Sequence, residues 1–226
     1  ATAKVATATW QKYGNPYPMQ LHREDRPGLI FARKKGLKES LYPFILFVDD
    51  DNRLDQNYLL EMTSVFETYT DAAVLGGENE AVFEGEKPEW FHRFEHSYAV
   101  GKPAKDFGEP SEIGLFGAGL CMRRAAYDQL IERGFESRLV GRTGENLSSG
   151  EDYELCKALK IAGWKVIFSP GLKLKHFITR PRLNWEYLKK LNRGISKSII
   201  WFLAYEYRIA KLRNPRRSAT EIWFSW

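Results

Sequence analysis

Apolar residues along the chain recur with two different periods, which predict an alternation of helices and strands. Apolar positions at helical spacing predict helices, and short uninterrupted apolar runs predict buried strands. The predicted helices span residues 2–13, 28–40, 55–69, 124–133, 151–162 and 184–212. The predicted strands span residues 44–48, 72–75, 116–122, 165–168 and 172–177. This alternation predicts an α/β domain with a largely parallel sheet.

Two segments interrupt the alternation. Residues 78–110 are rich in Glu, Gly and Pro around an aromatic island at 90–98, which predicts a loop-bearing insertion. Residues 134–150 are rich in Gly and Ser, which predicts a flexible connection. We therefore expect these two segments, and not the regular helices and strands, to determine ligand specificity.

The composition supports one sizeable folded domain. The chain has 226 residues, of which 43% are hydrophobic and 14% aromatic, so disordered and fibrous classes are excluded. Its two cysteines, Cys121 and Cys156, are too few for a disulfide framework or a cysteine-based zinc site. A reducing, cytoplasmic compartment is the simplest interpretation.

Positive charge is concentrated near the C-terminus. Residues 173–217 hold thirteen Lys and Arg against two acidic residues, whereas the whole chain has a net charge of only +5. Within this stretch, residues 184–212 form a basic amphipathic pattern. Such a pattern indicates an anionic partner, either phosphates or a membrane surface, although a solvated basic face fits equally well. No apolar run approaches the roughly 20 residues of a transmembrane helix.

Three adjacent carboxylates give the sharpest chemical signal. Asp49, Asp50 and Asp51 follow the predicted strand FILFV, at the strand end where α/β sheets bind ligands. Clustered carboxylates repel one another unless a cation offsets them, so a divalent metal with oxygen ligands is the natural resolution. Alternation along an extended backbone places Asp49 and Asp51 on the same side. A solvated acidic turn is the alternative.

A second acidic pair, Glu151 and Asp152, opens the predicted helix 151–162. A carboxylate at a helix N-terminus is fixed in direction and stays ionised, as a general base must be. The alternative is a capping box, in which Ser149 pairs with Asp152.

Two further segments carry weaker signals. His176 shares a strand face with Leu172 and Leu174, which also fits a hydrogen-bonded core histidine. Gly117 and Gly119 bracket Ala118 and permit close backbone approach to a ligand, although a bulge explains them equally well.

The order of these signals resembles a known family over nearly the whole chain. The segments that carry the resemblance are RPGLIFARKKG, FILFVDDDN, GAGLCMRRAAY, GEDYELCKALKIAGWKV and LKHFI, followed by RLNWEYLKKLNRG. In this order they are similar to family 2 glycosyltransferases of the GT-A fold. The resemblance implies a Rossmann-like sheet flanked by helices over residues 1–182, and a C-terminal helical extension over residues 183–226.

The resemblance also implies a reaction. It is the transfer of a sugar from a nucleotide sugar, such as a UDP- or GDP-sugar, to an acceptor hydroxyl with inversion. Asp49 and Asp51 match the DxD-type motif that binds the ribose and a Mn²⁺ or Mg²⁺ ion. Asp152 matches the base that deprotonates the acceptor, and Glu151 the residue that orients it. The remaining matches are a metal or diphosphate position at His176, nucleotide-side positions at Arg33 and Asp50, and a pocket lining at Gly117, Ala118 and Gly119.

Some features depart from the family pattern. The chain begins just after the position of the usual N-terminal strand–helix segment, Lys34 stands where Asn is usual, and the Q-x-x-R-W motif of processive synthases is missing. Single-sugar addition to a glycan or lipid-linked acceptor in exopolysaccharide assembly is therefore the expectation.

We expect the basic helix to rest on the inner face of the plasma membrane, with no nucleic-acid partner. The competing interpretations are a non-catalytic sugar- or nucleotide-binding remnant and a metal-dependent nucleotidyltransferase.

Overall fold

The elements alternate between helices and strands along the chain. The computed structural model describes residues 2–110, 114–139, 141–142, 147 and 149–218. Among these, the helices are α1 (Thr2–Lys12), α2 (Leu29–Glu39), α3 (Tyr58–Thr68), α4 (Arg124–Glu132), α5 (Glu151–Ile161) and α6 (Trp185–Arg213). The strands are β1 (Phe44–Leu46), β2 (Asn52–Leu54), β3 (Ala72–Phe83), β4 (Cys121–Arg123) and β5 (Lys165–Ile178). Short 3₁₀ helices are η1 (Phe91–Arg93), η2 (Glu95–Tyr98) and η3 (Arg180–Arg182). All six predicted helices are confirmed, with ends within about three residues of those expected.

The strands form one sheet of mixed direction. Their order is β1-β4-β3-β5-β2. The long ladder between β3 and β5 is parallel, whereas β1–β4, β3–β4 and β2–β5 are antiparallel. The α/β class is confirmed, but the expectation of a mostly parallel sheet holds only for the central ladder. Apolar runs report burial and not strand direction, which is set by tertiary pairing.

The two central strands are longer than their hydrophobic patterns indicate. Strand β3 continues to Phe83, so the start of the expected insertion is strand, and the two strands expected at 165–168 and 172–177 are one strand, β5. The pairing shifts register between Gly76 and Glu78. Here a side chain on Gly77 would collide with the backbone of Leu172. Close strand approach at this bulge therefore requires glycine.

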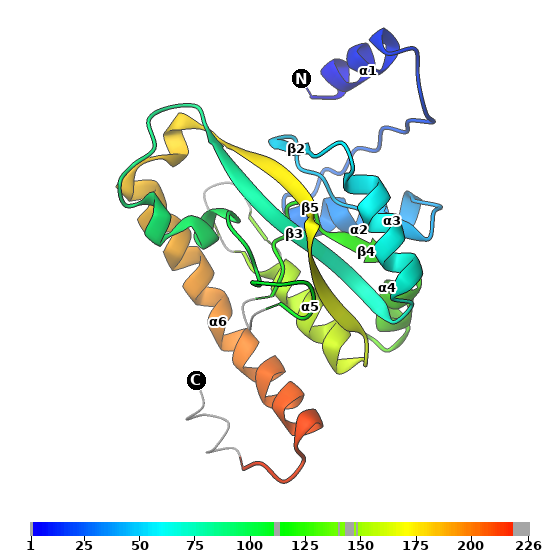
Figure 1. Cartoon of the computed structure of the whole chain (residues 1–226), viewed down its shortest axis with the longest axis vertical. Helices are drawn as coiled ribbons and strands as arrows, with labels where there is room; N and C mark the ends of the chain where they lie inside the picture. Colours follow the sequence, from blue (N-terminus) through cyan, green and yellow to red (C-terminus); the bar gives the residue numbers. More distant parts are fainter. Residues whose placement is uncertain (1, 111–113, 140, 143–146, 148, 219–226) are drawn as a thin grey trace.

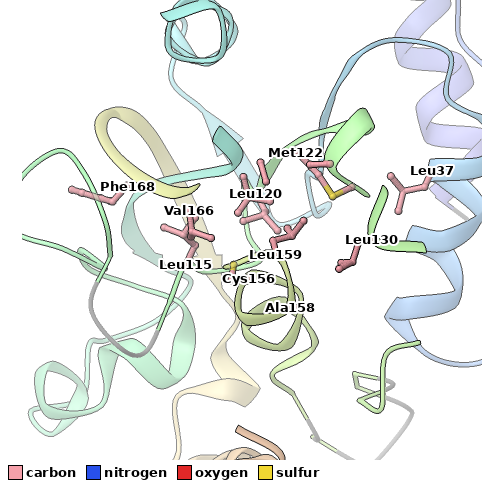
Figure 2. Close-up of a cluster of buried hydrophobic side chains, with 13 residues drawn as sticks. Leu37, Leu115, Leu120, Met122, Leu130, Cys156, Ala158, Leu159, Val166 and Phe168 are labelled. Atoms are coloured by element: carbon pink, nitrogen blue, oxygen red, sulfur yellow. The ribbon is translucent and has the colours of Figure 1, made fainter. Parts of the chain in front are cut away.

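Helices cover both the sheet and one another. Figure 1 shows α3 and α4 beside the twisted β3–β5 ladder, α5 beneath it, α6 running diagonally past α5, and α1 apart from the body. A core cluster joins the sheet to α2, α4 and α5 (Figure 2) through residues such as Met122, Leu130 and Leu159. A second cluster packs α6 against η1 and η2 through Leu188, Leu191 and Phe91. No helix in the described ranges is both long and apolar enough to cross a membrane.

Candidate active site

Most of the residues singled out by sequence come together where the turn after β1 meets α2, β5 and α5. Asn52 pairs with His176 across the β2–β5 ladder, and the backbone N–H of Phe177 donates to the Asp51 carbonyl at 2.8 Å. The acidic triplet itself is a turn, in which the Asn52 N–H donates to the Asp49 carbonyl. The topology thus delivers two distant segments to one place.

Asp51 accepts hydrogen bonds from three sides. His176 Nε2 and an Arg182 guanidinium nitrogen lie 3.3 and 3.2 Å from the same carboxylate oxygen, and the Asn52 amide donates to the other at 3.0 Å. Partial burial by itself raises the pKa of Asp51. The hydrogen bond from His176 and the charge of Arg182 outweigh this and lower the pKa below its usual value. Asp51 is therefore held as a carboxylate.

Arg33 and the acidic pair at the start of α5 form a second cluster. The Arg33 guanidinium contacts the Asp152 carboxylate directly and lies 3.8 Å from Glu151. Burial by itself lowers the pKa of Arg33, but the surrounding carboxylates, Asp152 first, raise it above its usual value. This ion pair spans 119 positions of the chain and ties α2 to α5.

Glu151 is the more deeply buried member of the acidic pair. Only 5% of its side chain is exposed, against 17% for Asp152, and its Oε2 has no hydrogen-bond partner among the described residues. Burial and the neighbouring charge of Asp152 raise the pKa of Glu151 to about 7. An apolar cavity lined by Phe47, Leu120 and Leu155 borders Glu151 and Arg33. Glu151 and Asp152, although adjacent, thus face different environments.

Asp49 links the two clusters electrostatically. Burial raises the pKa of Asp49, and so do the charges of Asp51 and Asp152. Arg33 and His176 oppose this increase without cancelling it. The predicted residues Arg33, Asp49, Asp51, Asp152 and His176 therefore form one connected set. The Asp50 side chain is exposed and makes no hydrogen bond or ion pair to any residue that the structure describes.

The glycine-flanked segment 117–119 divides between the site and the core. Gly117 abuts Asp152, and a side chain at Gly117 would overlap the carboxylate. Ala118 instead belongs to a hydrophobic cluster, and Gly119 accepts a 2.6 Å hydrogen bond from the Tyr58 hydroxyl through its carbonyl. Of these three residues, Gly117 is the one in contact with the acidic pair.

A comparison with protein families agrees with the resemblance carried by the sequence motifs. A family model described as "Glycosyltransferase like family 2" matches residues 28–196, about three quarters of the chain. The chain belongs to glycosyltransferase family 2. No curated protein gives a match in a sequence search. The matched region contains every residue of the connected set and ends within α6.

Solved glycosyltransferases share the fold. One is GalNAc-T7, crystallised with UDP, GalNAc and Mn²⁺. It is 14% identical to this chain with a TM-score of 0.55, and the alignment covers 96% of this chain and 44% of the GalNAc-T7 chain. Another is S. aureus TarS 1–349 in complex with UDP-GlcNAc, which is 14% identical with a TM-score of 0.53. This alignment covers 92% of this chain and 59% of the TarS chain. The chain thus spans about half the length of these structures. At this identity the likeness establishes the GT-A fold alone.

The candidate ligands for a divalent cation are the carboxylates and the histidine of the connected set. No group of three metal-ligating side chains lies close together among the described residues. Asp51 and His176 nevertheless form a pair whose facing atoms are 3.3 Å apart, near the ~3 Å between neighbouring ligands of one divalent ion. The buried Nδ1 of His176 has no partner among the described residues. Two protein ligands therefore fit such an ion, and the rest would come from the substrate and water.

Arg182 is a site residue that the sequence did not single out. Its guanidinium bonds Asp51 and lies over the rings of Tyr98 and Tyr187, with 13% of the side chain exposed. Its Nε is buried without a hydrogen-bond partner in the described chain. In sequence Arg182 is one of thirteen cations in a basic stretch, so nothing marks it. Its proximity to the DxD-type turn emerges only in three dimensions.

Proposed function

We propose that this glycosyltransferase moves one sugar from a UDP-sugar to an acceptor hydroxyl with inversion at the anomeric carbon. The observation that carries the proposal is the connected set of Arg33, Asp49, Asp51, Asp152 and His176 in a GT-A fold. Both neighbours described above were solved with uridine nucleotides, which supports UDP over GDP. The buried free thiols of Cys121 and Cys156 are in keeping with work in the cytoplasm.

Asp152 is the proposed general base. It is more exposed than Glu151, and Arg33 holds its carboxylate in a fixed direction. As the acceptor oxygen bonds to the anomeric carbon, the bond to the nucleotide phosphate oxygen breaks and the hydroxyl proton passes to Asp152. This single displacement leaves the sugar inverted. Glu151 orients the acceptor from the buried side.

The departing diphosphate needs positive charge beside it. Arg182 supplies a guanidinium whose buried Nε has no hydrogen-bond partner among the described residues. A positive charge that is already in position stabilises the negative charge that develops on a leaving group. Asp51 and His176 would hold a Mn²⁺ or Mg²⁺ ion, with the remaining ligands from the substrate and water, and Asp49 is assigned to the ribose of the donor. When bound, that ion neutralises charge developing on the diphosphate. We assign donor-side contacts to Arg33, Asp50 and Gly117. We further propose single-sugar, non-processive addition in glycan or exopolysaccharide assembly.

The test is the identity of the released product. The full chain is incubated with UDP-GlcNAc, UDP-GalNAc or UDP-glucose, with Mn²⁺ and glycan acceptors, and the nucleotide products are separated by chromatography. The proposal predicts UDP release from one donor and a product of inverted anomeric configuration by proton NMR. Release of pyrophosphate would instead identify a nucleotidyltransferase, and no turnover with any donor would favour a binding remnant.

A further inference from the structure

The solvent-facing side of α6 combines cations with protruding apolar side chains. We define the outer face of α6 as Lys190, Arg193, Lys197, Ile200, Trp201, Tyr207 and Arg208. At 3.6 residues per turn these residues fall within an arc of about 120°. All are exposed, with exposures of 74% for Ile200, 46% for Trp201 and 42% for Tyr207. A surface of this kind is unusual for a helix that only covers a core.

The core contacts of α6 use other residues. Leu188 and Leu191 are buried against η1 and η2. Farther along, Ser198 donates to the Ser149 carbonyl, and the Tyr205 hydroxyl donates to Glu154 at 3.0 Å. The residues of the outer face are therefore not needed for the packing of α6 against the rest of the domain.

The cations of the outer face are also unpaired within the described chain. Lys190, Arg193, Lys197 and Arg208 form no salt bridge to any described residue, whereas Arg213 near the helix end pairs with Glu109 at 2.9 Å. Glu186, which lies on the same arc, is neutralised by Lys189 at 2.5 Å. Because Glu186 is the one acidic residue on this arc, the face presents a net positive charge.

The apolar part of this face lies beyond the family match. The match ends at residue 196, whereas Ile200, Trp201 and Tyr207 follow it. Lys190 and Arg193 lie inside the matched region, so it is the apolar part of the outer face that calls for a separate explanation.

We propose that the outer face of α6 docks on a bilayer containing anionic phospholipids. Basic side chains attract acidic headgroups, Trp and Tyr favour the interfacial region, and an exposed Ile adds apolar insertion. A nucleic acid would use the cations but leaves Ile200 and Trp201 without a role. Arg182 contacts Asp51 and lies three residues before the start of α6, so the acidic site adjoins the N-terminal end of the helix that would dock. That position suits a lipid-linked acceptor, a point that rests on the proposed function.

Vesicle sedimentation of the full chain tests this surface. The vesicles are neutral phosphatidylcholine, or the same lipid with phosphatidylglycerol. The charge variant is Lys190→Glu/Arg193→Glu/Lys197→Glu, and its control makes the same charge change elsewhere, as Lys4→Glu/Lys12→Glu/Lys38→Glu. The apolar variant is Ile200→Ser/Trp201→Ser, and its control is Leu59→Ser/Leu60→Ser on α3, where both leucines are also exposed. All substituted positions are exposed, so each variant should fold, which circular dichroism checks.

The expected result is binding of the wild type to anionic but not neutral vesicles. The charge variant should bind at least about tenfold more weakly and the apolar variant several-fold more weakly, with both controls unchanged. Equal loss in variants and controls, unchanged binding of the α6 variants, or no binding by the wild type would overturn the proposal. So would loss of duplex DNA binding by the charge variant without loss of vesicle binding. UDP release to a soluble acceptor, measured on the same proteins, separates failure of docking from failure of the transferase assignment.

Discussion

The acidic end of the sheet and the outer face of α6 use charge in opposite ways. At the sheet, Arg33 and Arg182 are largely buried and each contacts a carboxylate far away in sequence. On α6, Arg193 and Lys197 are exposed and have no salt-bridge partner in the described chain. Buried pairs cost desolvation and depend on geometry, so one substitution has a large effect. Exposed charges act additively and are screened by salt, so only several together matter.

The largest expected effect is at the proposed base. Asp152→Asn removes the proton acceptor but keeps the shape of the side chain, so kcat should fall by about 10²–10⁴-fold with little change in donor binding. Steady-state kinetics with the best UDP-sugar measure this. Asp128→Asn, on the exposed side of α4, is the control and should match the wild type. Equal kcat values for the two variants would remove Asp152 from the mechanism.

A structural carboxylate two residues farther along α5, Glu154, should have the largest effect on stability. Glu154 is fully buried and accepts from the Ser137 hydroxyl, the Arg138 and Leu139 N–H groups and the Tyr205 hydroxyl. Glu154→Ala strands these donors and should lower the free energy of unfolding by about 3 kcal/mol.

Chemical denaturation measures this loss, and Tyr205→Phe provides the graded comparison. Tyr205→Phe removes one bond and should cost only about 1 kcal/mol. If Glu154→Ala were no more costly than Tyr205→Phe, the buried network would not anchor residues 137–139 to α5 and α6.

The pH dependence of stability should report Glu151. In the folded state the pKa of Glu151 is about 7, which lies above its value of about 4.5 in the unfolded chain. The contribution of Glu151 to stability is therefore fully present below about pH 4.5. This contribution is lost as pH rises through 7. Glu151→Gln should therefore raise Tm at pH 8, on the order of 5 °C, and change it little at pH 4.5. Scanning calorimetry at both values measures the shift, and an equal Tm change at the two pH values would contradict the assignment.

A smaller effect is expected at Arg182. Arg182→Ala removes a cation beside Asp51 and should raise the KM for the UDP-sugar about tenfold, with a lesser change in kcat. The matched comparison is Arg193→Ala on α6, which should leave KM and unfolding free energy unchanged with a soluble acceptor. A larger effect of Arg193→Ala than of Arg182→Ala would reverse the contrast between the two regions.

Local patterns predicted the helices well, because amphipathic spacing is a property of neighbouring residues. Sheet direction and the continuity of β5 were not predictable, since they depend on pairing between distant segments and on the bulge at Gly77. The same division holds at the site. Asp51 and His176 were found through the order of family motifs, whereas Arg182 was missed because one arginine in a basic stretch carries no local signal.

The most direct test of the donor site is a thermal-shift comparison of the wild type with Asp51→Ala. UDP, GDP, TDP and CDP are each added with and without Mn²⁺. A ligand that binds the native state increases the free energy of unfolding by mass action, by about 2.7 kcal/mol at a concentration of 100 times Kd. This gain in stability raises Tm. The account predicts a Tm increase for UDP that requires Mn²⁺ and disappears in Asp51→Ala. No shift with any nucleotide, or the same shift in both proteins, would contradict it.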